Sequence, residues 1–459
     1  MDKNGKKILS GALILGVAAF ISKLLGALYR IPLTRIIGGT GLGLYQMVFP
    51  VYTLLLDFSG ASVPNAVAKI IASYNKGEDR ENYARKILKT SLLFFSALGA
   101  VFTLLTAVFS NKIAIAQGNA DASLAYLYLS PSVFLVCVIC CFRGYFQGFA
   151  NMTFTAVSQI TEQAVKLAAG LLVASFFMPD VKKAVAGATF AITVSEFIAL
   201  IFMVIAYAVQ KKKKGYKSLG LDKKTFAVSL KQIFAYAVPI ALTGIILPFS
   251  KVIDSFLIVN LMTGRVENPT ALFGLFSGVA ATVIGLPVAV CYGVSAVVIP
   301  VLSSSKAEDK NKNALKAVLL TVMLSLPCAI ACAVFAPTII RFLFGYLGST
   351  ETAVAVNLLR ICSPCVVLLS LLQTLNGVLI GKDSPKKPII GMLFGVAVKT
   401  VIEIFTLSSP EINIFGAGIG AIACYFVADL VNLSMVFPVK TKRKEHESSR
   451  VKIRRYADL

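Results

Sequence analysis

Residues 130–148 of the chain read SPSVFLVCVICCFRGYFQG, and residues 363–381 read SPCVVLLSLLQTLNGVLIG. Both stretches open with Ser-Pro and carry glycine at their fifteenth and last positions, so they align at an offset of 233 residues. The chain therefore consists of two related halves. Three further matches share the offset: Val165-Lys166 with Val398-Lys399, Gly187-Ala188 with Gly420-Ala421, and the acid Glu196 with the acid Asp429.

Both halves are series of apolar stretches. Hydrophobic residues make up 57% of the chain, charged residues 15%, and the mean hydropathy is +0.80, whereas soluble domains are about half apolar and a quarter charged. A membrane-spanning helix needs about 20 apolar residues. Strand-like alternation is absent from the sequence, so we predict an all-α polytopic membrane protein. Its twelve predicted helices cover 8–29, 41–65, 88–110, 123–149, 155–177, 184–209, 232–261, 272–302, 314–336, 353–380, 388–407 and 414–437.

The twelve predicted helices divide into two sets of six. The N-terminal half covers residues 1–209 and the C-terminal half covers 232–437, with a basic linker at 210–231 and a basic tail at 438–459. A six-helix unit has both ends on the same side of a membrane, so the two halves have the same orientation. Transporters built from such parallel repeats place their substrate site between the halves. The pattern favours transport over an enzymatic or receptor function.

The formal net charge of +23 is distributed unevenly between alternate loops. One side of the membrane receives 32 Lys and Arg residues, in the N-terminus, alternate loops, linker and tail, and the other side receives 7. By the positive-inside rule both termini lie in the cytoplasm, and we expect a multi-pass protein of the bacterial cytoplasmic membrane. The basic loops would contact anionic lipid headgroups. Because the positive charges follow the membrane topology, nucleic-acid binding is disfavoured.

Enzymatic chemistry finds no support in the sequence. There is no GxxxxGK[ST] motif, and the single histidine, His446, lies in the tail, away from any nucleophile–base arrangement. The spacings Cys137-x-x-Cys140 and Cys362-x-x-Cys365 resemble metal or redox pairs, but no histidine lies near them, and we interpret these cysteines as small buried apolar residues. We therefore expect no catalytic residue, no metal and no cofactor.

Ionisable side chains within the predicted helices are functional candidates, because each costs at least about 2.5–3.5 kcal/mol on insertion scales. Glu162 and Lys166 lie four residues apart, as do Lys399 and Glu403, so each pair can partly neutralise itself on one helix face. Structural pairing and a role in a cavity both stay open for them. The full set is Lys23, Asp57, Arg143, Glu162, Lys166, Glu196, Lys251, Asp254, Arg360, Lys399, Glu403 and Asp429.

Basic residues in the first and seventh predicted helices suggest an anion site. Lys23 lies deep in the first helix with Arg30 two turns further on, and Lys251 lies in the corresponding helix of the second half. If these helices face each other across the central axis, the three cations converge on a cavity that suits a phosphate or pyrophosphate group. The remaining candidates for substrate binding are Arg35, Lys166 and Lys399, and those for Na⁺ or proton coupling are Asp57, Glu196, Asp254 and Asp429.

The N-terminal region carries a family resemblance. Residues 22–38, SKLLGALYRIPLTRIIG, followed by GLGLYQ at 41–46 and PVY at 50–52, are similar to the N-terminal signature of SpoVB-type polysaccharide exporters. These belong to the multidrug/oligosaccharidyl-lipid/polysaccharide (MOP) superfamily, together with MATE drug antiporters and MurJ lipid II flippases. Supporting matches are SVPNAVAK at 62–69, Arg143-Gly-x-x-x-Gly148 and Asp254-Ser255.

The resemblance implies a V-shaped, two-lobed transporter that alternates between inward-open and outward-open states. SpoVB-like and MurJ-like proteins are associated with moving undecaprenyl-pyrophosphate-linked sugars to the outer leaflet. Lys23 matches the first basic position of the MurJ-type motif Ser-Arg-x-x-Gly-x-x-Arg, and Arg30 falls one residue past the second. The arginines of the second and eighth MurJ helices have no counterpart in 41–65 or 272–302, and our hypothesis is that Lys251 substitutes for one.

The resemblance also sets the expected partners and the alternatives. We expect a monomer that handles a polyprenyl-pyrophosphate-linked saccharide among membrane lipids, with envelope-synthesis enzymes as further partners. Relatives of both kinds commonly have fourteen helices, and twelve are expected here. One alternative is a MATE-like antiporter of cationic drugs coupled to Na⁺ or H⁺, which would have an acidic cavity. The other alternative is a scaffold for envelope assembly that transports nothing.

Overall fold

The computed structural model describes residues 3–74, 79–213, 222–382, 384, 386–409 and 411–437. Within these ranges every regular element is a helix, as the hydropathy pattern predicts. Most of the basic linker, residues 214–221, and the whole tail, 438–459, lie outside the described residues.

The N-terminal half folds into six helical elements joined by short turns. Its first element, α1, contains the first two predicted helices, because the chain reverses at Gly38 with φ of 69° and ψ of −176°, backbone angles that only glycine adopts readily. A π-helical turn, Asp57–Ala61, then leads from α1 into α2. The elements are α1 (Lys3–Leu56), α2 (Val63–Ser73), α3 (Asp79–Ala116), α4 (Ser123–Gly148), α5 (Thr153–Phe177) and α6 (Val181–Lys213).

The C-terminal half has more breaks than its repeat partner. The seventh predicted helix is interrupted at Ile245, and the tenth at Ser363, just before Pro364, whose repeat mate Pro131 lies within the continuous α4. A second π-helical segment, Leu275–Ala280, joins α9 to α10. The elements are α7 (Lys223–Gly244), α8 (Ile246–Met262), α9 (Pro269–Gly274), α10 (Ala281–Ser304), α11 (Ala307–Val334), α12 (Ala336–Phe344), α13 (Ser349–Cys362), α14 (Pro364–Gly381), α15 (Lys387–Leu407) and α16 (Phe415–Val436).

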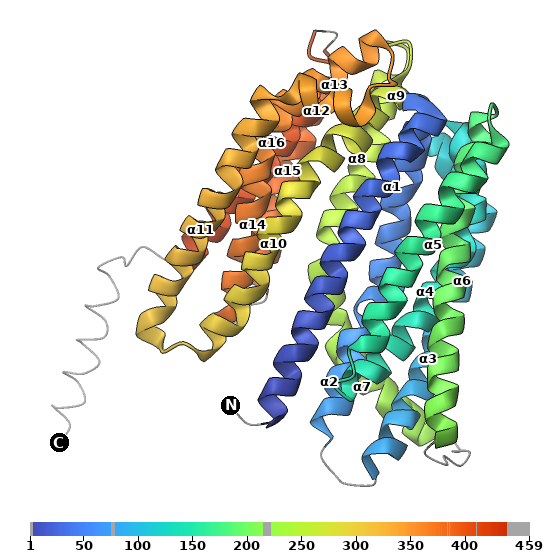
Figure 1. The fold of residues 1–459 in the computed structure, drawn as a ribbon, viewed down its shortest axis with the longest axis vertical. Coiled ribbons are helices and arrows are strands. Elements are labelled where there is room, and N and C mark those ends of the chain that lie inside the picture. The colour runs from blue at the N-terminus through green and yellow to red at the C-terminus, as the bar shows by residue number, and fades with distance from the viewer. Residues whose placement is uncertain are drawn as a thin grey trace, which may run out of the picture.

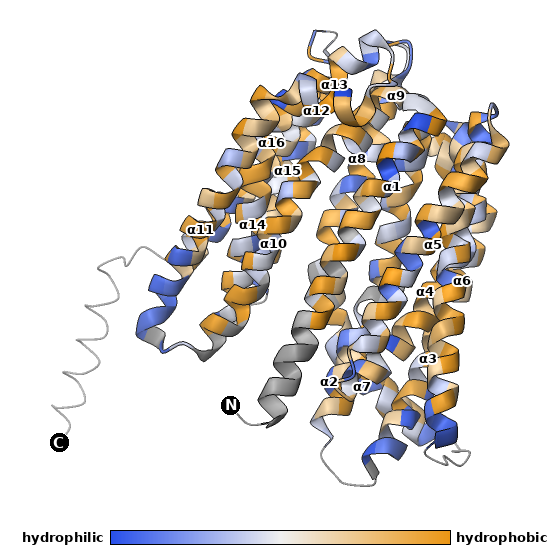
Figure 2. Cartoon of the chain, viewed as in Figure 1, coloured by the Kyte–Doolittle hydropathy of each residue, from blue (hydrophilic) through white to orange (hydrophobic). Residues whose placement is uncertain are grey.

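The described helices form a multi-pass membrane protein. Ten of them are long and apolar enough to cross a bilayer. The difference from twelve arises because α1 contains two of the predicted spans and the seventh span is divided between α7 and α8. Apolar residues cover the outer faces of the helices, as Figure 2 shows, and large side chains such as Phe176 and Phe342 are more than 80% exposed. In water such a surface would aggregate, whereas lipid covers it without cost.

Two groups of helices make up the molecule (Figure 1). We call α1–α6 the N-terminal lobe and α8–α16 the C-terminal lobe. Figure 1 shows the two lobes meeting at the end that carries α9, α12 and α13, and separating toward the end where α1 begins and α2 lies. We refer to these as the closed end and the splayed end.

One helix departs from the division expected at residue 232. Although α7 belongs to the second sequence half, it packs against α2 and α3 of the N-terminal lobe. The Tyr83 hydroxyl donates a hydrogen bond to Oε1 of Gln232 at 2.8 Å, and Lys69 Nζ lies 4.4 Å above the Tyr236 ring. The break at Ile245 therefore lets one predicted span belong to both lobes, through α7 on one side and α8 on the other.

Small residues allow the lobes to touch at the closed end. Gly43 of α1 faces Thr270 of α9, and Gly274 of α9 lies against the backbone of Gly39 and Gly43. Both the α1 pair and the α9 pair have the four-residue spacing of close-packed membrane helices. A Cβ atom at Gly274 would lie 2.6 Å from the Gly39 carbonyl oxygen, and one at Gly43 would overlap the Thr270 carbonyl oxygen. Asn268 Nδ2 also donates to Thr40 Oγ1 at 2.8 Å. Backbone-to-backbone packing thus holds this end together.

We predict that Gly43→Ala weakens the closed end. The added methyl group meets backbone rather than a movable side chain, so overpacking should lower the free energy of unfolding by about 1–3 kcal/mol. Thermal unfolding of the purified protein in detergent measures this loss. Gly285→Ala in α10 is the matched control, because nothing lies within 4 Å of the methyl group it adds. Equal melting temperatures for the two variants would contradict the packing described.

Candidate functional site

Arg30 connects the two lobes, two turns before α1 reverses at Gly38. It lies on α1, and its Nη1 donates a hydrogen bond to Thr282 Oγ1 of α10 at 3.2 Å. Its guanidinium carbon lies 5.9 Å from the centre of the Phe49 ring, on the return arm of α1. A guanidinium group suits this position, because it remains charged and stacks on aromatic faces while its other N–H groups stay available.

Lys251 approaches the same region from the C-terminal lobe. It lies on α8 and its side chain is exposed, whereas Asp254, one turn further on, is only 7% exposed. Helices α1 and α8, which carry Arg30 and Lys251, pack against each other. Neither Arg30 nor Lys251 forms an ion pair with a carboxylate among the described residues.

The other basic candidates on α1 lie at different positions. The backbone of Lys23 continues the same helix two turns before Arg30, and its side chain lies outside the described part of the structure. Arg35 is exposed and lies near Tyr346, whose hydroxyl donates to the Ile31 carbonyl oxygen at 2.6 Å. Arg35 thus lies by the contacts of the closed end, away from Lys251.

Lys166 lies one aromatic ring away from Arg30. It is buried in the N-terminal lobe, on α5, with Nζ 5.1 Å from the centre of the Phe49 ring and 5.5 Å from that of Tyr29. Cation–π contacts of this kind contribute about 2 kcal/mol when they are shielded from water. Phe49 therefore contacts a buried cation, Lys166, and the inter-lobe cation Arg30.

Lys399 belongs to a buried network in the C-terminal lobe. Its Nζ lies 2.5 Å from Oδ2 of Asp254 and 3.4 Å from Oγ of Ser250, both on α8. Oε1 of Glu403 lies 3.8 Å from the same Nζ, so the predicted Lys399–Glu403 pair is present. Its distance is longer than that of the Lys399–Asp254 pair. Lys399 therefore bridges two acids, Asp254 and Glu403, while Arg30 and Lys251 have no direct ion pair among the described residues.

The N-terminal lobe pairs its acids differently from the prediction. Glu162 bonds to Arg143 of α4, with Oε2 and Nη2 3.0 Å apart, rather than to Lys166, so that predicted pair is wrong. Arg143 Nε also donates to Ser158 Oγ at 2.9 Å. A guanidinium group reaches two acceptors at once, which explains its preference for this buried position. Glu196 is only 2% exposed and accepts a hydrogen bond from the Tyr52 hydroxyl.

The remaining acids lie at a helix break and in the C-terminal lobe. Asp57 begins the π-helical turn of the N-terminal lobe and is half-buried, and a methyl group added at Gly244, where α7 ends, would lie 3.9 Å from its carboxyl carbon. Asp429 of α16 is 5% exposed, and neither carboxylate oxygen has a hydrogen-bond partner among the described residues. These acids do not join Arg30 and Lys251 in one cluster.

The arrangement can bind an anion between the lobes. Two cations from different lobes, beside an already neutralised acid, would repel each other until a negative group lies between them.

The sequence did not predict the roles of Thr282 and of the Lys399–Asp254 pair, because neither carries a signal that says which helices pack together. Within the described ranges, no group of three His, Cys, Asp or Glu side chains is arranged to hold a metal ion.

Comparison with known proteins identifies relatives of the whole chain. Residues 8–306 match the family described as polysaccharide biosynthesis protein, and residues 239–405 match the MatE family. Stage V sporulation protein B of Bacillus subtilis is 25% identical over 96% of this chain and 86% of its own length. Lipid II flippase MurJ of the same organism is 26% identical over 91% of this chain and 81% of its own length.

Solved structures show the same fold. An inward-facing MATE-family multidrug transporter of the MOP superfamily superposes with a TM-score of 0.73 at 15% identity, over 94% of this chain and 97% of that one. Lipid II flippase MurJ in an inward closed conformation gives a TM-score of 0.72 at 15% identity, over 94% and 88%. The match to the family covers well over half of the sequence. The chain belongs to the polysaccharide biosynthesis protein family.

Proposed function

We propose that the protein moves an anionic lipid-linked saccharide, carried on a polyprenyl pyrophosphate, from the inner to the outer leaflet by alternating access. The observation that carries the proposal is that α1, which carries Arg30, packs against α8, which carries Lys251, and that neither cation forms a direct ion pair with a carboxylate among the described residues. The pyrophosphate lies between them, and Lys23 extends the site along α1. The polyprenyl tail stays in lipid while the headgroup crosses.

The chemistry of the two cations favours a pyrophosphate. Arg30 presents a planar set of donors that matches phosphate oxygens in pairs, and Lys251 adds a compact charge. Because the cations come from different lobes, a dianion between them draws the lobes together. A singly charged ligand would leave one cation unpaired.

The orientation follows from the charge of the loops. The splayed end carries the start of α1, the end of α2 and the turn after α10, and the sequence around them is basic. By the positive-inside rule this end faces the cytoplasm, with both termini. The separation of the lobes at this end supports an inward-open state in which headgroups enter from the inner leaflet.

The relatives support the class of substrate, and the site argues against the drug antiporter. One relative is named for lipid II and one for sporulation, and lipid II is a lipid-linked saccharide. A cation-exporting antiporter needs an acidic cavity, whereas Asp254 beside Lys251 is occupied by Lys399. A scaffold that transports nothing would have no use for cations that converge from two lobes.

The membrane potential supplies part of the driving force. Moving a negative group outward across an inside-negative membrane is favourable by about 2.3 kcal/mol per charge per 100 mV. Coupling to Na⁺ or protons supplies the rest, and Asp429 is the best-placed residue, because its buried carboxylate has no hydrogen-bond partner in the described part of the chain. Glu196, Asp57 and Asp254 are the further candidates for coupling.

We predict that Lys251→Gln and Arg30→Gln each lower the rate of headgroup translocation. A charge-assisted hydrogen bond to the pyrophosphate contributes about 1.5–3 kcal/mol, so each loss should be about 10-fold to 100-fold. Lys23→Ala should have a similar effect. The measurement is the accessibility of a fluorescent undecaprenyl-pyrophosphate sugar in proteoliposomes. Lys112→Gln is the control, because Lys112 lies at the far end of α3 over Phe109. A wild-type rate for Lys251→Gln would refute the site.

The same proteoliposomes separate the flippase from the antiporter. The wild-type protein should translocate the lipid-linked sugar and leave a cationic dye undisturbed, because like charges at Arg30 and Lys251 repel the dye. Dye movement driven by an imposed Na⁺ or H⁺ gradient, with no translocation of the sugar, would establish the antiporter instead.

We predict that Asp429→Asn removes any dependence of translocation on a Na⁺ or H⁺ gradient and leaves the response to membrane potential. The amide keeps the size of the side chain and abolishes its charge. Rates measured with each gradient imposed separately test this. Asp180→Asn serves as the control, because Asp180 is exposed and pairs only with its neighbour Lys183 among the described residues. An unchanged gradient response in Asp429→Asn would exclude Asp429 as the coupling residue.

A further inference from the structure

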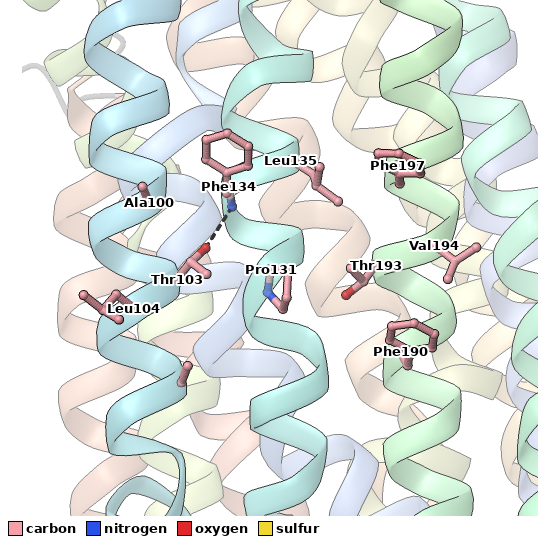
Figure 3. A pocket seen from close by; sticks show the side chains of 11 residues that line it. Ala100, Thr103, Leu104, Pro131, Phe134, Leu135, Phe190, Thr193, Val194 and Phe197 are labelled. Atoms are coloured by element: carbon pink, nitrogen blue, oxygen red, sulfur yellow. Dashed lines mark hydrogen bonds between the residues drawn. The ribbon is translucent and has the colours of Figure 1, made fainter.

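A groove runs over the outer face of the N-terminal lobe, between α3, α4 and α6. Its volume is about 730 Å³, and every residue that lines it comes from these three helices. Figure 3 shows Leu104 on one wall, Pro131 and Phe134 on the floor, and Phe190 and Phe197 on the other wall. We call it the α3–α4–α6 groove.

The groove is apolar because its hydroxyl groups are bonded inward. Thr103 Oγ1 donates to the Ser130 carbonyl oxygen at 2.9 Å and accepts from the Phe134 N–H at 3.2 Å, the contact drawn in Figure 3. Thr193 Oγ1 donates to the Tyr128 carbonyl oxygen at 2.9 Å. Two threonines thus satisfy backbone groups around Pro131, which cannot donate a hydrogen bond itself. Water in the groove would find few partners.

The groove lies at the level of the hydrocarbon. Phe197 is midway along α6 and Phe134 is close to midway along α4, both of which are long and apolar enough to span the membrane. Leu104 is 64% exposed and Phe197 52% exposed. Its open side therefore faces the bilayer interior, so hydrocarbon is the chemistry that meets it.

We propose that the α3–α4–α6 groove is a binding site for one hydrocarbon chain of a bilayer phospholipid, which stays with the protein. A chain in the groove contacts α3, α4 and α6 together, whereas a chain on a convex helix surface contacts one side only. Those added dispersion contacts are lost if the groove stands empty. The chain fills the space beside the Pro131 segment and so supports α4.

A phospholipid chain fits this site better than the tail of the transported substrate. Arg30 and Lys251 lie on α1 and α8, and neither helix contributes a residue to the groove. A tail attached at the inter-lobe site would have to pass around the N-terminal lobe to reach it. The proposal is therefore independent of the proposed transport function.

The absence of tryptophan from the sequence makes the test direct. Phe197→Trp places a single fluorophore in the groove, and Phe394→Trp places one on an exposed, mid-helix position of α15, 58% exposed in the native phenylalanine. Each purified variant in detergent is titrated with phospholipid that carries brominated acyl chains, which quench tryptophan on contact. We expect quenching of the groove tryptophan to saturate near one lipid per protein. Quenching of the control tryptophan at position 394 should require far more lipid.

A second variant excludes ordinary surface contact. Ala100→Phe, introduced together with Phe197→Trp, fills the groove from α3 and should abolish the stoichiometric quenching. Ala107→Phe, seven residues further along α3 in the wall of the same groove, repeats the test in case the first variant does not fold. The same lipid dependence for the groove and control tryptophans would overturn the proposal. Displacement of the brominated lipid by stoichiometric polyprenyl phosphate, but not by unbrominated phospholipid, would also overturn it.

Discussion

The cost of placing charge inside a bilayer determines how the rest of this structure is arranged. Each ionisable group there must be neutralised, bonded or given access to water. Glu162 satisfies this requirement by pairing with Arg143, and Asp254 by pairing with Lys399. Once these pairs are formed, Arg30 and Lys251 are left without a direct ion pair among the described residues. The electrostatic character of the site is therefore decided by which charges are already paired within each lobe.

The two repeats use related residues for different purposes. Lys166 and Lys399 are repeat mates, yet Lys166 lies against aromatic rings while Lys399 bonds an acid on α8. Lys399 is therefore part of an ion pair, whereas Lys166 is separated from Arg30 by the Phe49 ring. Internal symmetry thus supplies a common scaffold, and single contacts within it make one lobe chemically distinct from the other. An asymmetric ligand, with a charged head and an apolar tail, requires such a difference.

Movement between two states requires breaks and weak contacts, and the structure has both. The span that joins the lobes is interrupted at Ile245, so α7 can remain on the N-terminal lobe while α8 follows the C-terminal lobe. At the closed end the lobes meet through glycine backbone and a few amide hydrogen bonds. Large apolar side chains of both lobes, such as Leu42 and Phe273, are also buried in one cluster at this end, so separation of the lobes there requires lipid or new contacts to cover them.

The sequence by itself determined the helical, membrane-spanning class, because hydrophobic length is a local property of the chain, and it predicted two related halves and an orientation from repeat spacing and loop charge. That Arg30 and Lys251 belong to one site stays a prediction. Tertiary structure alone decided that Glu162 pairs with Arg143 and that Asp254 pairs with Lys399. The physical reason is that a sequence shows which residues share a helix face, whereas ion pairs between helices depend on which helices pack together.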